Sequence, residues 1–148
     1  MVAWLVERGA DVEGGTREEG RQTPLFLAAN YGHAAAARRL LEGGADASRA
    51  VHGGVSPLWI ACYGGYFEAA RALVEGGADV GQVDGMGDTP LKMACQNGHV
   101  DVARLLIEKD ADVGQAMNDG VTPLFIACCY GHVDVARLLI EKLSLIHI

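Results

Sequence analysis

The chain has 148 residues, half of them hydrophobic, which excludes intrinsic disorder and suffices for one domain with a sizeable core. Its formal net charge of −7 argues against a nucleic-acid partner, since phosphate binding requires clustered Lys and Arg, and it suits a protein partner with a basic surface better. No run approaches the roughly 18 apolar residues of a membrane span, and the four cysteines lack paired framework spacing. We therefore expect no membrane contact and a reducing compartment, the cytosol or alternatively the nucleus.

The first predicted element, over residues 1–12, is a short apolar helix followed by a turn at GADV. The same helix and turn recur later in the chain, but there another helix precedes them. Met1 aligns with one residue in each later copy, namely Ala36, Ala69, Val102 and Val135. We therefore expect residues 1–12 to be the second half of a repeat, and the chain to be a fragment of a longer protein.

Four complete repeats follow, starting near residues 23, 56, 89 and 122. Each begins with a hydroxyl residue before Pro-Leu, and successive copies are 33 residues apart: Thr23, Ser56, Thr89 and Thr122. A glycine recurs at the same period, as Gly32, Gly65, Gly98 and Gly131. Such constant spacing predicts a repeat architecture in which each copy is one supersecondary unit.

Each repeat has the pattern of two short helices. Thr89 can cap a helix that Pro90 opens, because its hydroxyl accepts an orphan backbone N–H and Pro presets φ at the first helical position. Gly98 can take the left-handed conformation that ends this helix. Its apolar stripe consists of Leu91, Ala94 and Cys95.

The second helix of the same repeat also has an apolar inner side. We assign to it Val102, Leu105, Leu106 and the apolar stem of Lys109. Both helices have about nine or ten residues, which is too short for a helix to be stable alone. Neighbouring repeats are therefore expected to stack and to bury their stripes between them.

The stretch TPLKMACQNGHVDVARLLIEKDADV resembles the ankyrin repeat family, whose repeats have TPL at a helix start, GH between two helices and GADV before a finger-like turn. The resemblance covers residues 1–142. It implies an all-α fold, an α-solenoid of stacked helix-turn-helix repeats with finger-like β-turn loops. The family usually has His after TPL, whereas this chain has Phe26, Trp59, Lys92 and Phe125. We expect the three aromatic side chains to replace a hydrogen bond with buried area.

The last six residues, LSLIHI over 143–148, stand where the repeat predicts a turn. One interpretation is a short hydrophobic tail that folds over the end of the stack. The other is a non-native tail, because LSLIHI resembles one translated frame of a transposon end sequence used as an adapter in sequencing libraries. We favour the second interpretation and place no functional residue there.

The cysteines and histidines follow the repeat period. Cys62, Cys95 and Cys128 are expected to be small buried residues, spaced too widely for a disulfide, whereas Cys129 is off the periodic position and expected to be exposed. A histidine follows the repeated glycine in three copies, as His33, His99 and His132, with Tyr66 in the fourth. Because a tyrosine can stand in their place, we assign these histidines to packing rather than to metal binding or catalysis.

Charged side chains recur on the second helix of each repeat. Four arginines each precede a glutamate by four residues, in the pairs Arg38–Glu42, Arg71–Glu75, Arg104–Glu108 and Arg137–Glu141. Such pairs are weak contributors on a solvated face. Neither a phosphate-binding loop nor a nucleophile motif occurs, so we expect no enzyme activity, no cofactor and no metal site in this chain.

What the resemblance implies instead is a binding surface at the finger tips and the exposed ends of the first helices. The helix-end candidates are Asn30, Tyr31, Tyr63, Gln96, Asn97, Cys129 and Tyr130, and the finger candidates are His52, Met86, Asp88, Asn118 and Asp119. Tyrosine buries a large area at low entropic cost and retains a polar tip, which suits it to binding hot spots.

The predicted function is thus that of a protein–protein interaction module, a scaffold or adaptor, acting as a monomer through its concave face and fingers on an unidentified protein. Two alternatives remain open. The repeats could recruit substrates for a larger enzyme, such as a kinase or a ubiquitin ligase, whose catalytic domain is missing here. They could also form a purely structural spacer.

Overall fold

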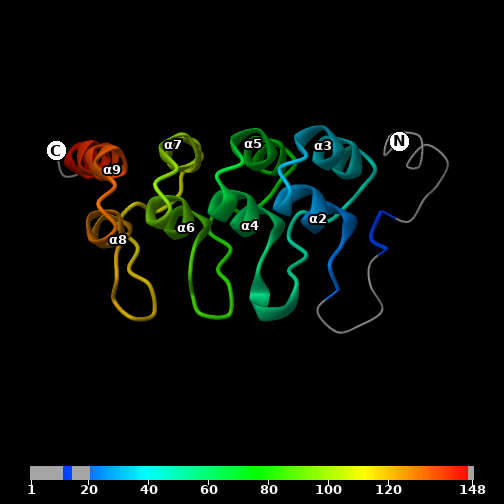
Figure 1. Cartoon of the computed structure of the whole chain (residues 1–148), viewed down its shortest axis with the longest axis horizontal. Helices are drawn as coiled ribbons and strands as arrows, with labels where there is room; N and C mark the ends of the chain where they lie inside the picture. Colours follow the sequence, from blue (N-terminus) through cyan, green and yellow to red (C-terminus); the bar gives the residue numbers. More distant parts are fainter. Residues whose placement is uncertain (1–11, 15–20, 147–148) are drawn as a thin grey trace.

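The computed structural model describes residues 12–14 and 21–146, which form a single row of stacked helix pairs (Figure 1). The first, inner helix of each pair is α2 (Pro24–Asn30), α4 (Pro57–Gly64), α6 (Pro90–Gln96) or α8 (Pro123–Cys129). The second, outer helix is α3 (Ala34–Glu42), α5 (Phe67–Glu75), α7 (Val100–Glu108) or α9 (Val133–Ile146), and one 3-10 turn, η1, spans His52–Gly54. No strand occurs among these residues, so the predicted all-α solenoid is confirmed.

The inner helices begin where the sequence predicts them. A hydroxyl oxygen accepts the backbone N–H three residues ahead in every repeat, over 3.1 to 3.3 Å, at Thr23, Ser56, Thr89 and Thr122. Proline occupies the next position, where its missing N–H costs nothing. Each inner helix has only seven or eight residues, slightly fewer than expected, because the turn glycine ends it early.

The turn between the two helices of a repeat depends on glycine and on the next repeat. Gly65 has φ +74°, and a Cβ there would lie 2.5 Å from the His99 ring. Gly98 has the same relation to His132, with φ +73°. The glycine therefore meets two demands at once, a left-handed backbone and the close approach of a ring from the following repeat.

The core runs continuously through the stack. Each inner helix packs against the next inner helix, and α3 packs against α5 in the outer row. The most buried leucines recur at the repeat period, Leu25, Leu58 and Leu91 from the inner row and Leu73, Leu106 and Leu139 from the outer row. Fully buried alanines, among them Ala61 and Ala94, let the helices approach closely. Stacking thus supplies the burial that such short helices need.

Two expectations about the outer helices are wrong. Lys109 is exposed, because it is the residue that caps α7 and lies beyond the last inward-facing turn. The second is that the repeat pattern breaks off after Lys142, whereas α9 continues through Ile146. Leu143 packs against the core, and the Ser144 hydroxyl donates to the Ile140 carbonyl oxygen over 2.8 Å. The expected helix over residues 1–12 lies almost entirely outside the described residues.

Candidate binding surface

Three described loops project from the stack as fingers, each between an outer helix and the next inner helix (Figure 1). A backbone hydrogen bond between residues four apart closes each finger, with Val51 donating to Val55, Asp84 to Asp88 and Met117 to Val121 over 2.8 to 3.1 Å. The equivalent residues are 33 positions apart. The predicted finger-like turns therefore share this closing hydrogen bond in successive repeats, although the first finger also contains η1.

Neighbouring fingers are hydrogen-bonded to one another. The Gly85 N–H donates to the Gly53 carbonyl oxygen over 2.7 Å, and the Asn118 side-chain amide donates to the Met86 carbonyl oxygen over 3.0 Å. We call the three tips together, residues 51–55, 84–88 and 117–121, the finger row. Asn118 and Met86, two predicted contact residues from different repeats, are thus brought together.

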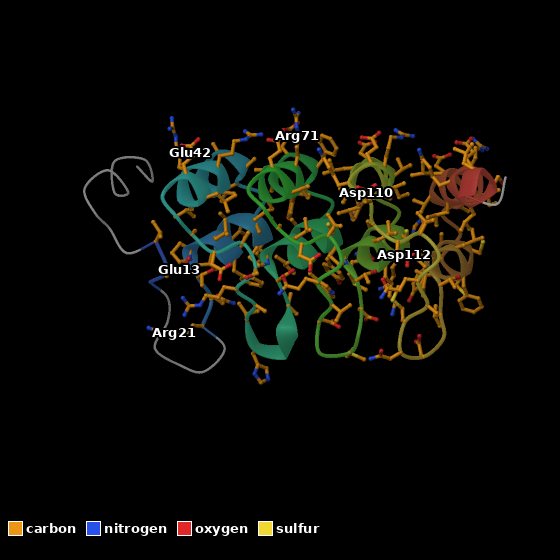
Figure 2. The ribbon with its side chains drawn as sticks, turned by 180° about the vertical axis from the view of Figure 1, so that it is seen from behind. Glu13, Arg21, Glu42, Arg71, Asp110 and Asp112 are labelled. Atoms are coloured by element: carbon orange, nitrogen blue, oxygen red, sulfur yellow. The ribbon has the colours of Figure 1, made fainter. Side chains whose placement is uncertain are left out.

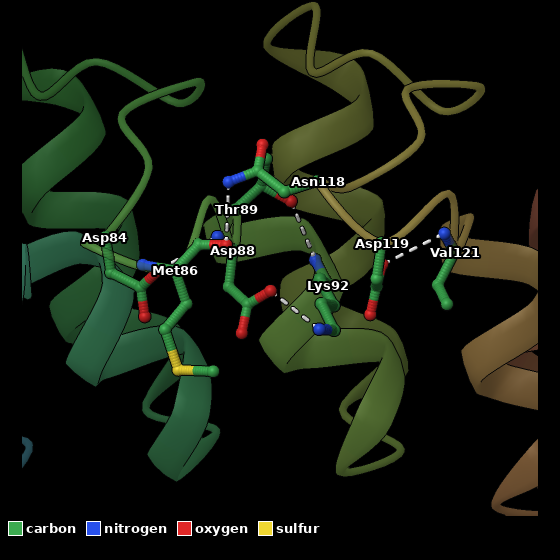
Figure 3. Close-up of polar contacts among 8 residues, drawn as sticks. All are labelled: Asp84, Met86, Asp88, Thr89, Lys92, Asn118, Asp119 and Val121. Carbon is green, nitrogen blue, oxygen red and sulfur yellow. Dashed lines mark hydrogen bonds and ion pairs between the residues drawn. The ribbon is translucent and has the colours of Figure 1, made fainter.

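The middle finger is organised by carboxylates (Figure 3). Asp84 accepts the backbone N–H groups of Met86 and Asp88 over 2.9 Å each. Asp88 in turn accepts from the Lys92 ammonium over 2.6 Å, and both side chains are largely buried. Asp88, which the sequence predicted as a partner contact, therefore already forms an ion pair with Lys92 inside the protein.

The ends of the inner helices are joined across repeats. The Tyr63 carbonyl oxygen accepts the Asn97 amide over 2.8 Å and lies 3.1 Å from Nε2 of His99. In the same way, Nε2 of His132 lies 2.8 Å from the carbonyl oxygen of Gln96, which belongs to the preceding repeat. Because a carbonyl can only accept, each ring must carry its proton on Nε2. His99 and His132 therefore have structural contacts between repeats, as the sequence predicts.

Three tyrosines stand exposed along these helix ends, as predicted. Tyr31 is 62% exposed, Tyr130 57% and Tyr63 47%. Tyr63 also stacks on Trp59, one turn earlier in α4, with ring centroids 5.6 Å apart and the planes 8° from parallel. The indole nitrogen of Trp59 is buried and has no hydrogen-bond partner among the described residues.

The remaining candidates are spread along the same surface. Met86 is 76% exposed and His52 is exposed in η1, both at finger tips. Cys129 is exposed at the end of α8, as predicted, and Asn30 is half-buried at the end of α2. The exposed Asp119 accepts the Val121 N–H over 3.0 Å.

Sequence reasoning did not select Trp59 and Asp84 for this surface. A signal for Trp59 was present, because it precedes Tyr63 by four residues and therefore shares its face of the helix. For Asp84, the signal was its place at the start of the Gly-rich turn DGMGD, where an aspartate side chain binds backbone N–H groups. Both residues lie beside predicted contacts.

The expectation for the aromatic residues after Thr-Pro-Leu or Ser-Pro-Leu is confirmed only in part. Phe26 is buried and Trp59 is half-buried, but Phe125 is 57% exposed. Cys128, on the same helix, is also exposed, so the prediction that it is buried is wrong. The reason is the same for both residues. No further inner helix in the described part of the chain covers α8 in the way that α6 covers α4.

The other two periodic cysteines are buried as predicted. Burial raises the pKa of the Cys62 thiol strongly and that of Cys95 to about 12, because the protein interior disfavours a thiolate. Burial therefore favours the protonated form of both thiols, which is the less reactive one.

The outer helices carry the arginines and glutamates, but their pairing differs from the prediction. Only Arg71 and Glu75 form the expected pair, over 3.0 Å, and this pair raises the pKa of the Arg71 guanidinium. Arg38 instead contacts Glu68 of the next repeat over 3.2 Å. Exposed long side chains gain little from any one partner, so the sequence interval does not determine the pairing.

Among the described residues, no helix has the length and apolar character needed to cross a membrane. In the same part of the chain, no three His, Cys, Asp or Glu side chains are grouped so as to hold a metal ion.

A row of near-identical helix pairs that presents fingers and exposed aromatic residues along one surface defines a solenoid repeat protein. The family model described as "Ankyrin repeats (3 copies)" matches residues 1–84 and 76–147, and the chain belongs to the ankyrin repeat family. Members of this family are generally protein–protein interaction modules and are typically non-catalytic. A comparison with curated proteins gave no match.

Proposed function

We propose that residues 1–142 recognise a partner protein through the surface formed by the inner-helix ends and the finger row. The observation that carries this proposal is the exposure of Tyr31, Tyr63 and Tyr130, each of which stands at the end of an inner helix. Tyrosine and tryptophan are enriched among the few residues that supply most of the binding energy in protein interfaces. A purely structural spacer would have no need for them.

The proposal makes the protein a scaffold or adaptor without catalysis of its own. The family membership supports an interaction role, and the inter-repeat hydrogen bonds support a rigid surface. If the repeats instead recruit substrates for an attached enzyme, the partner is that substrate. It would bind to the same surface.

The test is selection of binding peptides from a displayed library on the purified chain, with competition by free protein. Binding of the selected peptides is then measured on Tyr31→Ala/Tyr63→Ala/Tyr130→Ala. A matched control, Val133→Ala/Ile140→Ala, removes exposed apolar area from outer helix α9, where the two side chains are 65% and 52% exposed. We expect only the tyrosine variant to lose binding. Equal retention by both variants, with both folded by circular dichroism, would contradict the proposal.

A further inference from the structure

The acidic charge of the protein is distributed unevenly between its two sides. Among the described residues, the outer helices carry seven carboxylates and six basic side chains, which nearly balance. The inner helices and the loops carry eight carboxylates and four basic side chains. Figure 2 shows Glu42 and Arg71 on the outer edge, Asp110 beside the outer helices and Asp112 closer to the inner helices. Within the finger row itself, the carboxylates are Asp84, Asp88 and Asp119, and the row contains no lysine or arginine.

Two basic side chains near the fingers are already paired with carboxylates of the protein itself. Lys92 is held by Asp88, and Arg49 lies 3.1 Å from Glu13. Asp84 and Asp119, in contrast, bind only backbone N–H groups, so their negative charge is not compensated by a cationic side chain in the described structure. Both stand in the finger row.

The aromatic pair of Trp59 and Tyr63 lies on the same side. It belongs to α4, which directly follows the finger of residues 51–55, and the next finger, with Asp84, is hydrogen-bonded to that one. A parallel aromatic pair offers a flat face of negative π density, on which a planar guanidinium stacks well.

We propose that the partner is a basic, arginine-bearing protein segment, with an arginine stacked on the Trp59–Tyr63 pair and its neighbours attracted by the finger carboxylates Asp84 and Asp119. This inference rests on the proposed function, since it names the partner chemistry of the same surface. The charge asymmetry and the aromatic pair are separate observations that point to one kind of ligand.

The test uses fluorescein-labelled peptides of twelve residues in which Ser alternates with Arg, Lys or Glu, and measures their affinity for the full chain by fluorescence anisotropy. We expect the Arg peptide to bind most tightly, the Lys peptide less tightly and the Glu peptide least. The affinity for the Arg peptide should exceed that for the Lys peptide by about two- to fivefold, the contribution of one exposed cation–π contact. Tyr63→Ala is expected to remove the preference for Arg over Lys while leaving both peptides ahead of Glu.

Charge-matched variants separate a local site from general attraction. Asp84→Asn/Asp119→Asn keeps the oxygen that binds the backbone N–H groups but removes two charges from the finger row. Asp101→Asn/Asp134→Asn removes two charges from the outer helices. We expect the first variant to weaken the Arg peptide by about threefold or more, and the second to have a clearly smaller effect.

Equal weakening by both pairs would overturn the inference, and so would equal binding of the Arg and Lys peptides. Either result leaves the proposed function intact if the library-selected peptides still depend on the tyrosines. Loss of that dependence would instead contradict the proposed function. Thermal unfolding by circular dichroism verifies that each variant is folded.

Discussion

Gly65 and Gly131 occupy equivalent positions in the repeat but have different surroundings. Both have φ +74°, so both bear the cost that a left-handed conformation imposes on any residue with a Cβ. Only Gly65 has a ring over it, that of His99, whereas nothing lies within 4 Å of the position where a Cβ would stand on Gly131. The two positions therefore separate backbone strain from steric exclusion.

We expect Gly131→Ala to lower the free energy of unfolding by about 1 kcal/mol, the left-handed cost alone. Gly65→Ala should cost about 1 to 3 kcal/mol more, because its Cβ must displace His99 and weaken the contact of that ring with the Tyr63 carbonyl oxygen. Urea denaturation followed by circular dichroism measures both. Equal costs would mean that the histidine ring moves aside freely.

The cysteines provide a second comparison between like residues in unlike surroundings. At pH 8 we expect Cys128 and Cys129 to react with a thiol reagent quickly, whereas Cys62 and Cys95 react only as fast as the protein opens, because burial raises their pKa well above that pH. Intact-mass spectrometry counts the modified thiols over time. Cys128→Ser/Cys129→Ser serves as the control and should show no fast phase. Four equally fast thiols would contradict the packing described for the core.

At the scale of the element, the residues after each outer helix decide where it ends. Glycines follow α3 and α5, and Gly44 and Gly77 both have φ +95°. Asp110 takes the equivalent position after α7 with φ +67°, the one described residue other than glycine with positive φ. In α9 the corresponding residues are Lys142 and Leu143, and the helix continues. Glycine, or a tolerant aspartate, is thus what stops these helices.

Asp110→Gly is therefore expected to raise the free energy of unfolding by about 1 kcal/mol, since it removes the left-handed cost without removing a described contact. Asp110→Ala should lower stability, as alanine tolerates this conformation less well than aspartate. Thermal and urea unfolding of the two variants give the sign directly. A stabilising alanine would show that the backbone here relaxes away from the left-handed region.

The comparison of prediction and structure is clearest at this scale. The helix starts at Thr23 and its equivalents and the glycine turns were predictable, because each depends on a local backbone requirement that one residue type meets. The exposure of Cys128 was not, since its burial depends on whether another repeat covers it. The length of α9 was missed because the tail was treated as an interruption, although leucine and isoleucine favour helix continuation.

For the proposed binding surface, the sequence predicted that the tyrosines at the inner-helix ends are exposed, and they are. It did not reveal that the Asn97 and Asn118 side chains serve hydrogen bonds between repeats. Those bonds join residues more than 30 positions apart, so they become visible only once the stacking register is known. The partner residues themselves remain a proposal.

At the scale of the whole molecule, stability should vary along the stack because each repeat contacts only its neighbours. Helix α6 buries six of its residues, whereas α8 buries only Pro123 and Ala127. We expect amide hydrogens of α8 to exchange faster than those of α4 and α6 in native conditions, as local opening there exposes less apolar surface. Hydrogen exchange followed by mass spectrometry resolves the three helices as separate peptides. Uniform protection would indicate that the repeats open only together.

The hydrogen bonds along the finger row have a consequence for how a partner is bound. Loops that become ordered only on association lose conformational entropy at that moment, which weakens the complex. Here Gly85 is already bound to Gly53 and Asn118 to Met86, so the tips are held in place before any contact is made. The protein thus presents a preorganised surface, whose order is established when the repeats fold rather than when the partner arrives.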